Sequence, residues 1–366
     1  MLDSLAGLRI SMVGSNMARD MKPILLIGGH GATGRMTSRI LRERYPALPL
    51  VIGGRDVAAA ELWAMKLGRA SALRVDLDKP DLGLAEDSGG YGAVIVLGMD
   101  EHYSAMAYAK RHAIPYICVT GGAFETGSEF VMAHGGAPQT AIILAPHWFC
   151  GAAMLPAIHL ADSFAVVDRI AVAILIDRNG RPSGAATTAD FQRIDKASKT
   201  MLVRKGGKLQ WISRRAGTLS YHGVAGRMLQ GLPAVSIDVA SLAAASAAPD
   251  IHVLETWGDS ASFQRGEQPT DEIVIELTGT ASDGAPLHIR QEIVASRGVA
   301  PLTANMIAML TEAAAGLGDF VPLAPGVYTP EHILDPGVVV RRLAEAGAVF
   351  TTSVLGEDPG TVQGVL

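Results

Sequence analysis

The feature that most constrains this chain is a glycine-rich turn between an apolar segment and a helical one. The apolar run is Ile24–Ile27, and the following segment, Gly28–Gly34, holds glycines at 29, 31 and 34 in the spacing G-x-G-x-x-G. In such a turn the first glycine permits a tight bend, the second lets a pyrophosphate approach the backbone, and the third allows close contact between helix and strand. The N–H groups and the positive dipole end of the helix then attract the anion.

The context of this turn predicts a dinucleotide-binding βαβ unit, because the turn follows a strand pattern, opens a helix and leads to a second strand. A glycine-rich turn that binds no ligand is the alternative. The chain contains 41 glycines in 366 residues, against roughly 26 at average usage, so several places need tight turns or close backbone contacts. The cofactor contacts expected in this first turn are Gly29, Gly31, Ala32, Thr33 and Gly34.

Short apolar runs alternate with helical periods from Lys22 onward. This alternation is typical of βαβ units and predicts an α/β fold with a doubly wound parallel sheet of the Rossmann type. The expected strands are Ile24–Ile27, Leu50–Ile52, Leu73–Val75, Ala93–Leu97, Tyr116–Val119 and Ala141–Leu144. The clearest helices between them are Gly34–Tyr45, Val57–Leu67, His102–His112 and Glu125–His134.

The pattern changes after Gly151, where longer strands with partial period-2 alternation predict an inserted α+β domain with a mostly antiparallel sheet. These strands are expected at Ile170–Ile176, Ile251–Thr256, Glu272–Leu277 and Leu287–Val294, and helices return at Pro301–Leu317 and Pro336–Ala346. The predicted division is an N-terminal extension at 1–21, a Rossmann domain at 22–150 completed by C-terminal helices within 300–366, and a substrate and dimerisation domain at 151–299.

The end of the second strand indicates which dinucleotide is bound. NAD-binding folds usually place an acidic residue there to bond the ribose 2′-hydroxyl, whereas this chain continues with Gly53, Gly54 and Arg55 before Asp56. A guanidinium can form two hydrogen bonds with a 2′-phosphate, so NADP is favoured over NAD. A solvated Arg55 paired with Asp56 is the alternative.

Two further cofactor contacts are expected where later strands end. Asp76, after the third strand, can accept a hydrogen bond from the adenine amine. Gly98, after the fourth, leaves room for the middle of the cofactor to cross the edge of the sheet.

Charge, cysteine content and hydropathy exclude several other classes of protein. With 31 basic and 36 acidic residues the net charge is −5, which offers no basic surface to nucleic acid or an anionic membrane. The two cysteines, Cys118 and Cys150, form neither a disulfide framework nor a metal pair, and they fit a reducing cytoplasm. No apolar run is long enough to span a membrane, and no histidine–acid cluster has metal-ligand spacing. A small-molecule substrate is therefore the expected partner.

Several segments carry a resemblance to a known family. They are Gly28–Arg35, Gly53–Asp56, Val75–Asp78, Glu101–Tyr103, Tyr116–Gly121, Ser183–Thr188, Ser236–Ser241 and Gly326–Glu331. Through them the chain resembles the saccharopine dehydrogenase-like oxidoreductases, a group that includes lysine 6-dehydrogenases and mycobacterial trans-acting enoyl reductases. The resemblance implies a Rossmann domain completed by C-terminal helices, an inserted α+β domain that binds substrate and forms a homodimer, and NAD(P)-dependent hydride transfer.

The chain departs from the saccharopine-forming members of that family in two segments on the substrate side. Those members place a Ser-Tyr pair after the threonine that matches Thr120, whereas this chain has Gly121 and Gly122. Where they have a Gly-x-Asp-Pro-Gly turn, this chain reads Pro146–Gly151. The departures favour a bulkier or more apolar substrate than saccharopine.

Three residues follow strand ends closely enough to act in chemistry at the cleft outside the carboxyl ends of the strands. They are Tyr103, after the fourth strand, and His147 and Cys150, after the sixth. His147 is the best general acid of the three, since the unperturbed pKa of histidine is about 6.5. The alternatives are a histidine bonded to the backbone at a helix entry, a buried apolar cysteine, and a tyrosine that packs at the foot of its helix.

These observations predict an NADP(H)-dependent oxidoreductase of this group that transfers a hydride to or from a C=N, C=O or C=C bond of a small molecule. A regulatory protein that senses NADP(H) without turnover is the alternative. The long segment after Gly151 favours the enzyme, because a sensor needs only the Rossmann part and a short appendage.

Overall fold

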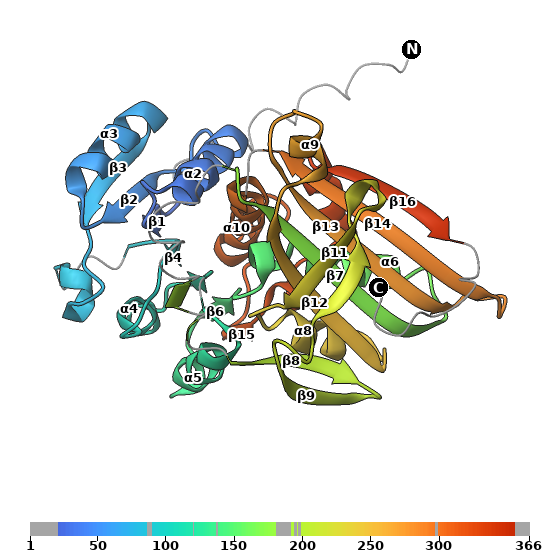
Figure 1. Ribbon diagram of the computed structural model, residues 1–366. Helices are drawn as coiled ribbons and strands as arrows, with labels where there is room; N and C mark the ends of the chain where they lie inside the picture. Colours follow the sequence, from blue (N-terminus) through green and yellow to red (C-terminus); the bar gives the residue numbers. More distant parts are fainter. Residues whose placement is uncertain are drawn as a thin grey trace, which may run out of the picture.

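The computed structural model describes residues 21–85, 90–119, 121–136, 138–180, 192–193, 196, 199–296 and 299–355. Within them the chain forms two sheets, one in each of two adjoining parts of the molecule (Figure 1). Residues 1–20, Thr120 and Ser183–Thr188 lie outside the described residues.

The first sheet has seven parallel strands in the order β15-β6-β5-β4-β1-β2-β3, which confirms the doubly wound Rossmann arrangement. Its strands are β1 (Ile24–Ile27), β2 (Leu50–Gly54), β3 (Ala70–Arg74), β4 (Ala93–Val96), β5 (Tyr116–Cys118), β6 (Ala141–Leu144) and β15 (Gly326–Tyr328). Its connecting helices are α2 (Ala32–Arg44), α3 (Val57–Leu67), α4 (Ser104–Arg111) and α5 (Ala123–His134), with the short 3₁₀ turn η1 (Pro80–Gly83) after β3.

The strands β1, β4 and β6 are buried along their whole length because helices cover both faces of this sheet. Alternate residues enter different cores: Leu26 packs in the cluster beneath α2 and α3, and Leu25 in the cluster beneath α4. This two-sided burial explains why the strands read as continuous apolar runs rather than as an alternating pattern.

The second sheet has nine strands, and most of its pairs are antiparallel, as expected. Its main path is β10-β11-β12-β7-β13-β14-β16, β8 pairs with β12 and β9, and the single parallel pair on this path is β12 with β7. The bounds are β7 (Val166–Asp177), β8 (Thr200–Lys205), β9 (Lys208–Ser213), β10 (Leu219–His222), β11 (Met228–Pro233), β12 (Asp250–Gly258), β13 (Thr270–Thr280), β14 (Pro286–Ser296) and β16 (Val349–Leu355).

Helices lie between the two sheets and join them. Helix α10 (Val299–Ala315) packs on α2, on β4 to β6 and on β14, while α11 (Pro336–Glu345) packs on α6 (Met154–Ala161). The remaining elements are α8 (Asp238–Ala245), α9 (Ala261–Gln264) and the turns η2 (Trp148–Gly151), η3 (Val224–Gly226) and η4 (Pro330–His332). No helix of the described part of the chain is both long and apolar enough to cross a membrane.

A buried carboxylate ties three of these helices together. Glu312 of α10 accepts hydrogen bonds from Arg44 at the end of α2, at 3.1 Å, and from both terminal nitrogens of Arg342 on α11, at 2.5 and 2.7 Å. Its side chain is only 2% exposed. The two guanidinium groups therefore compensate for the burial of this charge.

The C-terminal segment is divided between the two sheets. Helix α10 packs on the first sheet and strand β15 joins it, whereas α11 packs on α6 and α10, and β16 pairs with β14 in the second sheet. Part of 300–366 thus belongs to the second sheet. The strand was not expected because Thr351, Thr352 and Ser353 interrupt its apolar pattern, and its side chains are mostly exposed.

Candidate active site at the carboxyl edge of the parallel sheet

The turn between β1 and α2 has the close packing that its glycines predict. A Cβ on Gly34 would lie 2.5 Å from the Cα of Gly29, and a Cβ on Gly29 would lie 2.9 Å from the Leu26 carbonyl oxygen. No side chain caps α2 at Gly31, and no acidic residue stands in the first turn. The first amides of the helix, which include those of Ala32 and Thr33, are therefore available to an anion.

The charged residues at the end of β2 have different surroundings. Asp56 caps α3, accepting a hydrogen bond from the Ala59 amide at 3.0 Å, while the neighbouring Arg55 is exposed. A Cβ on Gly54 would lie 2.8 Å from the ring of His30. The Asp56 carboxylate thus bonds to the helix, whereas the Arg55 guanidinium faces solvent.

Asp76 and Gly98 lie further along the same edge of the sheet. Asp76 is half-buried, and its side chain accepts a hydrogen bond from the Asp78 amide at 3.3 Å. A Cβ on Gly98 would meet none of the described residues within 4 Å. Packing within the protein therefore does not require glycine at this position, which fits a space kept open for a ligand.

Tyr103 lies at the entry to α4, next to this space. Its backbone is left-handed, with φ of 52°, and its hydroxyl lies 2.9 Å from the Ser128 Oγ on α5. The preceding Asp100 is buried and accepts hydrogen bonds from the amides of Ala105 and Met106, both at 3.0 Å. Tyr103 is half-buried, so a molecule in the cleft can still reach it.

A charged group that was not predicted from the sequence lies near the ends of β4 and β5. Arg193, which belongs to the segment between β7 and β8, forms an ion pair with Glu125 in the first turn of α5. Its second terminal nitrogen lies 3.1 Å from the Met99 Sδ, after β4. Beneath this pair, Glu129 of α5 is 5% exposed. The second domain therefore contributes a cation directly above the carboxyl ends of β4 and β5.

The structure does not support a chemical role for Cys150. The residue is 1% exposed within the apolar core, and burial raises the pKa of its thiol well above the ordinary range. A thiol held neutral in this way is not a nucleophile. The alternative of a buried, apolar cysteine therefore holds, although the backbone there is unusual, with φ of 51° at Phe149 and 56° at Cys150.

His147 occupies a buried junction between the two parts of the molecule. Its Nε2 lies 2.8 Å from the Ser241 Oγ on α8 and 3.8 Å from the Glu331 Oε2 on η4. The neighbouring Trp148 amide donates to Asp238 at 3.0 Å, and burial raises the pKa of Asp238 against the opposing effect of His147. Because the His147 side chain is fully buried, it holds α8 and η4 against the end of β6, and no face of it is open to a substrate in this conformation.

Two segments of the family resemblance, Ser236–Ser241 and Gly326–Glu331, meet at this junction with Pro146–Gly151, where the chain departs from the family. The three segments are distant in sequence, and each contributes a residue to the contacts of His147 or its neighbour. No role was predicted from the sequence for Ser241, Asp238 or Glu331. Their convergence could not be predicted, since it depends on the packing of the two domains.

Glu129 could have been predicted as a buried acidic residue from its helical spacing. The buried face of α5 consists of Thr126, Glu129 and Ala133, so an acidic residue stands at helical spacing on the face that packs against the sheet. Arg193 offered no such signal, because nothing local links it to α5.

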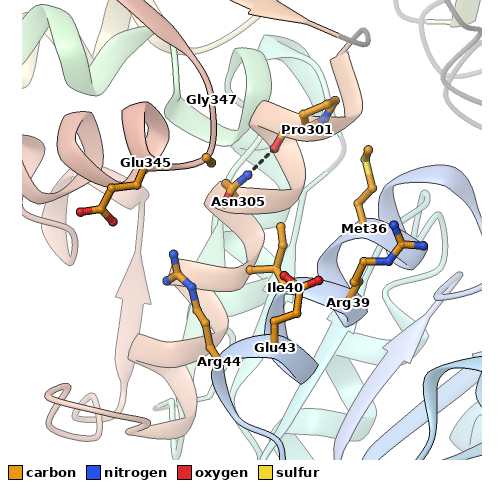
Figure 2. A pocket seen from close by; sticks show the side chains of 10 residues that line it. Met36, Arg39, Ile40, Glu43, Arg44, Pro301, Asn305, Glu345 and Gly347 are labelled. Atoms are coloured by element: carbon orange, nitrogen blue, oxygen red, sulfur yellow. Dashed lines mark hydrogen bonds between the residues drawn. The ribbon is translucent and has the colours of Figure 1, made fainter.

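A pocket of about 590 Å³ lies elsewhere, between α2, α10 and the end of α11 (Figure 2). Asn305 projects toward it, and its amide nitrogen donates to the Pro301 carbonyl at 2.9 Å. None of the predicted site residues lines this pocket; the lining residues are Met36, Arg39, Ile40, Glu43, Arg44, Pro301, Asn305, Glu345, Ala346 and Gly347. The described residues contain no cluster of three or more metal-binding side chains.

Comparison with known proteins gives a match in fold alone. No family model matches the chain, and no curated protein matches it in sequence. Among solved structures, apo saccharopine dehydrogenase (L-Glu forming) from Saccharomyces cerevisiae aligns with a TM-score of 0.65 at 12% identity, covering 92% of this chain and all of that one. A scyllo-inositol dehydrogenase from Lactobacillus casei, solved with NAD(H) and scyllo-inositol, aligns with a TM-score of 0.45 at 13% identity, covering 89% and 97%. The fold implied by the family resemblance is thus confirmed: this chain has the fold of saccharopine dehydrogenase.

Proposed function

We propose that this protein is an NADP(H)-dependent oxidoreductase that reduces or oxidises a C=N, C=O or C=C bond of a small molecule. The observation that carries the proposal is the arrangement along one edge of the parallel sheet. After β1, the N-terminus of α2 has no side-chain cap and its glycines are closely packed. After β4, a Cβ on Gly98 would meet no described residue within 4 Å. Arg193 and Glu125 form an ion pair at the start of α5, which follows β5. This order follows the path of a dinucleotide that binds across the carboxyl ends of the strands.

The residues present fit such a cofactor. Gly29, Gly31, Ala32, Thr33 and Gly34 would hold the pyrophosphate, and Gly98 would leave room for the part that leads to the nicotinamide. When bound, the reduced nicotinamide supplies a hydride. Arg55 would bind the 2′-phosphate and Asp76 the adenine amine, so NADP is favoured over NAD.

The substrate would lie between Tyr103 and Arg193, above the bare backbone of Gly121 and Gly122. Arg193 is placed to orient an electronegative group, and Tyr103 to donate a hydrogen bond. The other predicted acid, His147, would act by holding the domains together. A substrate domain that begins near Gly151 agrees with this arrangement, since Arg193 comes from it.

The first test measures NADPH and NADH binding, followed by NADPH consumption with a panel of imines, ketones and enoyl compounds. The Arg55→Ala variant is expected to lose at least about tenfold of the NADPH preference, about 1.4 kcal/mol, with NADH affinity unchanged. An unchanged ratio of the two affinities would refute the choice of NADP. Tight binding without consumption across the panel would favour the alternative, a protein that senses NADP(H).

The expected homodimer and cytoplasmic location also belong to this proposal. The edge strand β16 exposes Val349, Val354 and Leu355, by 60%, 71% and 36%, and an open apolar edge of this kind is a common site of pairing. Both cysteines are buried and neither forms a disulfide, which fits a reducing compartment. Light scattering of the purified protein tests the dimer: a monomer mass at micromolar concentration would contradict it.

A further inference from the structure

Glu129 is a buried carboxyl group whose presence packing does not explain. Its residue is 5% exposed on the face of α5 that meets the sheet. Its Oε2 is buried and has no hydrogen-bond partner among the described residues. A carboxyl group with an unpaired buried oxygen destabilises the fold relative to an apolar residue of similar size. Its retention therefore points to a role other than stability.

The position of Glu129 places it directly behind the candidate substrate site. A Cβ built on Gly121 would lie 3.3 and 3.5 Å from the two carboxylate oxygens of Glu129 and 3.5 Å from the Pro146 Cβ. Gly121 has φ of 136°, a backbone conformation that side chains rarely adopt. Gly121 therefore places no side chain beside the carboxyl group in the loop after β5.

The groups that face Glu129 favour its neutral form. Burial, Glu125 on its own helix and Asp100 after β4 raise its pKa to about 7, while Arg193 from the second domain acts in the opposite direction. Tyr116 on β5 also interacts with it, and burial raises the pKa of that phenol far above neutral, so it adds no charge. The carboxyl group can therefore both hold and release a proton near neutral pH.

We propose that Glu129 holds the proton that accompanies hydride transfer in this cleft; this inference rests on the proposed function. A bound reduced nicotinamide would supply a hydride to the carbon of a C=O or C=N bond, and the π electron pair of that bond would move to the heteroatom. Glu129 would give its proton to that atom, past Gly121, directly or through one water molecule. The resulting Glu129 carboxylate would regain a proton from solvent.

The test uses the charge of the nicotinamide and needs no substrate. The ring of NADP⁺ carries a positive charge that the ring of NADPH lacks, so a nearby carboxyl group should lose its proton when the oxidised form binds. At pH 7 a group with a pKa of about 7 is half protonated, so binding of NADP⁺ can release up to about 0.5 proton. Titration calorimetry in two buffers of different ionisation enthalpy measures this number for each form. The 2′-phosphate is common to both forms and cancels in the difference.

We expect wild-type protein and the exposed control Glu345→Gln to release more protons with NADP⁺ than with NADPH. Glu129→Gln should bind both forms and lose this difference. Equal differences in the wild type and Glu129→Gln would overturn this inference and leave the proposed function intact. Failure of the wild type to bind either form would overturn both. If Glu129→Gln does not fold, the ratio of the wild-type affinities for NADP⁺ and NADPH is measured between about pH 5.5 and about pH 8.5. This ratio should rise with pH. A ratio that does not change with pH would refute the inference.

Discussion

Replacing Gly34 with alanine perturbs the contact that fixes α2 against the first turn. The new Cβ would lie 2.5 Å from the Cα of Gly29 and 2.7 Å from its carbonyl carbon and oxygen. These are backbone atoms, so no side chain can rotate away, and the helix must move until the contact reaches an ordinary separation. Such overpacking costs about 1–3 kcal/mol, against a gain of about 1 kcal/mol from the higher helix propensity of alanine. We expect a net loss of about 0–2 kcal/mol, toward the upper end because the contacts are with backbone atoms.

The same movement withdraws the amides of the first turn from the phosphate. Losing one hydrogen bond to a charged group costs about 1.5–3 kcal/mol, so NADPH affinity should fall about 10–100-fold. Urea unfolding and a fluorescence titration with NADPH measure the two effects on one preparation. Gly34→Ala with an unchanged unfolding midpoint and unchanged affinity would refute the packing argument.

Gly98→Ala is the matched control, because its Cβ would meet none of the described residues within 4 Å. Its stability should stay within about 0.5 kcal/mol of the wild type. NADPH affinity should still fall at least about tenfold, since the methyl group would occupy space assigned to the cofactor. Retained affinity would show that the cofactor does not pass over the end of β4.

Two further substitutions test the electrostatics of the interior. Glu312→Ala leaves two guanidinium groups without their carboxylate and should lower the free energy of unfolding by about 3 kcal/mol, which is at the low end for a buried pair because Arg44 is 32% exposed. Urea unfolding measures this loss, with the exposed Glu345→Ala as the control. Equal stability of the two variants would contradict the prediction. Burial and the nearby Asp177 raise the pKa of Asp271 to about 7. Between about pH 4 and about pH 7 the folded protein therefore binds more protons than the unfolded chain. The stability that this group contributes is lost as the pH rises through that window. Asp271→Asn should therefore lose less stability than the wild type between pH 6 and 8, and parallel curves of unfolding free energy against pH would refute this.

The cofactor end of the site could be predicted because its chemistry is local in sequence. The glycine spacing at 29, 31 and 34 predicts the tight turn, the close contact between helix and strand, and the exposed amides. The structure shows the same packing. The short parallel strands before Gly151 were equally predictable, since two-sided burial requires continuous apolar runs. The observed ends of these strands differ from the predicted ends by one to three residues, because exposed positions such as those at the start of β3 also pair in the sheet.

The substrate end could not be predicted to the same extent, because its contacts join distant segments. Arg193 reaches Glu125 from another domain, and His147 meets Ser241 across the domain junction. Strand β16 was missed for a different reason: its pairing with β14 depends on backbone hydrogen bonds, while most of its side chains remain exposed and three polar residues interrupt its apolar pattern. Patterns of side-chain hydropathy contain little information about such an edge strand.

The placement of β15 and β16 has a consequence for how this protein folds as it is synthesised. The chain leaves the first sheet after β6, builds most of the second, and only then returns to add β15 to the first sheet and β16 to the second. The first sheet cannot be completed before residue 328 has left the ribosome, and the second cannot be completed before residue 355 has. The exposed edges of β6 and β14 are therefore unpaired for most of translation, which makes this the period when the nascent chain is most prone to aggregate and most dependent on chaperones.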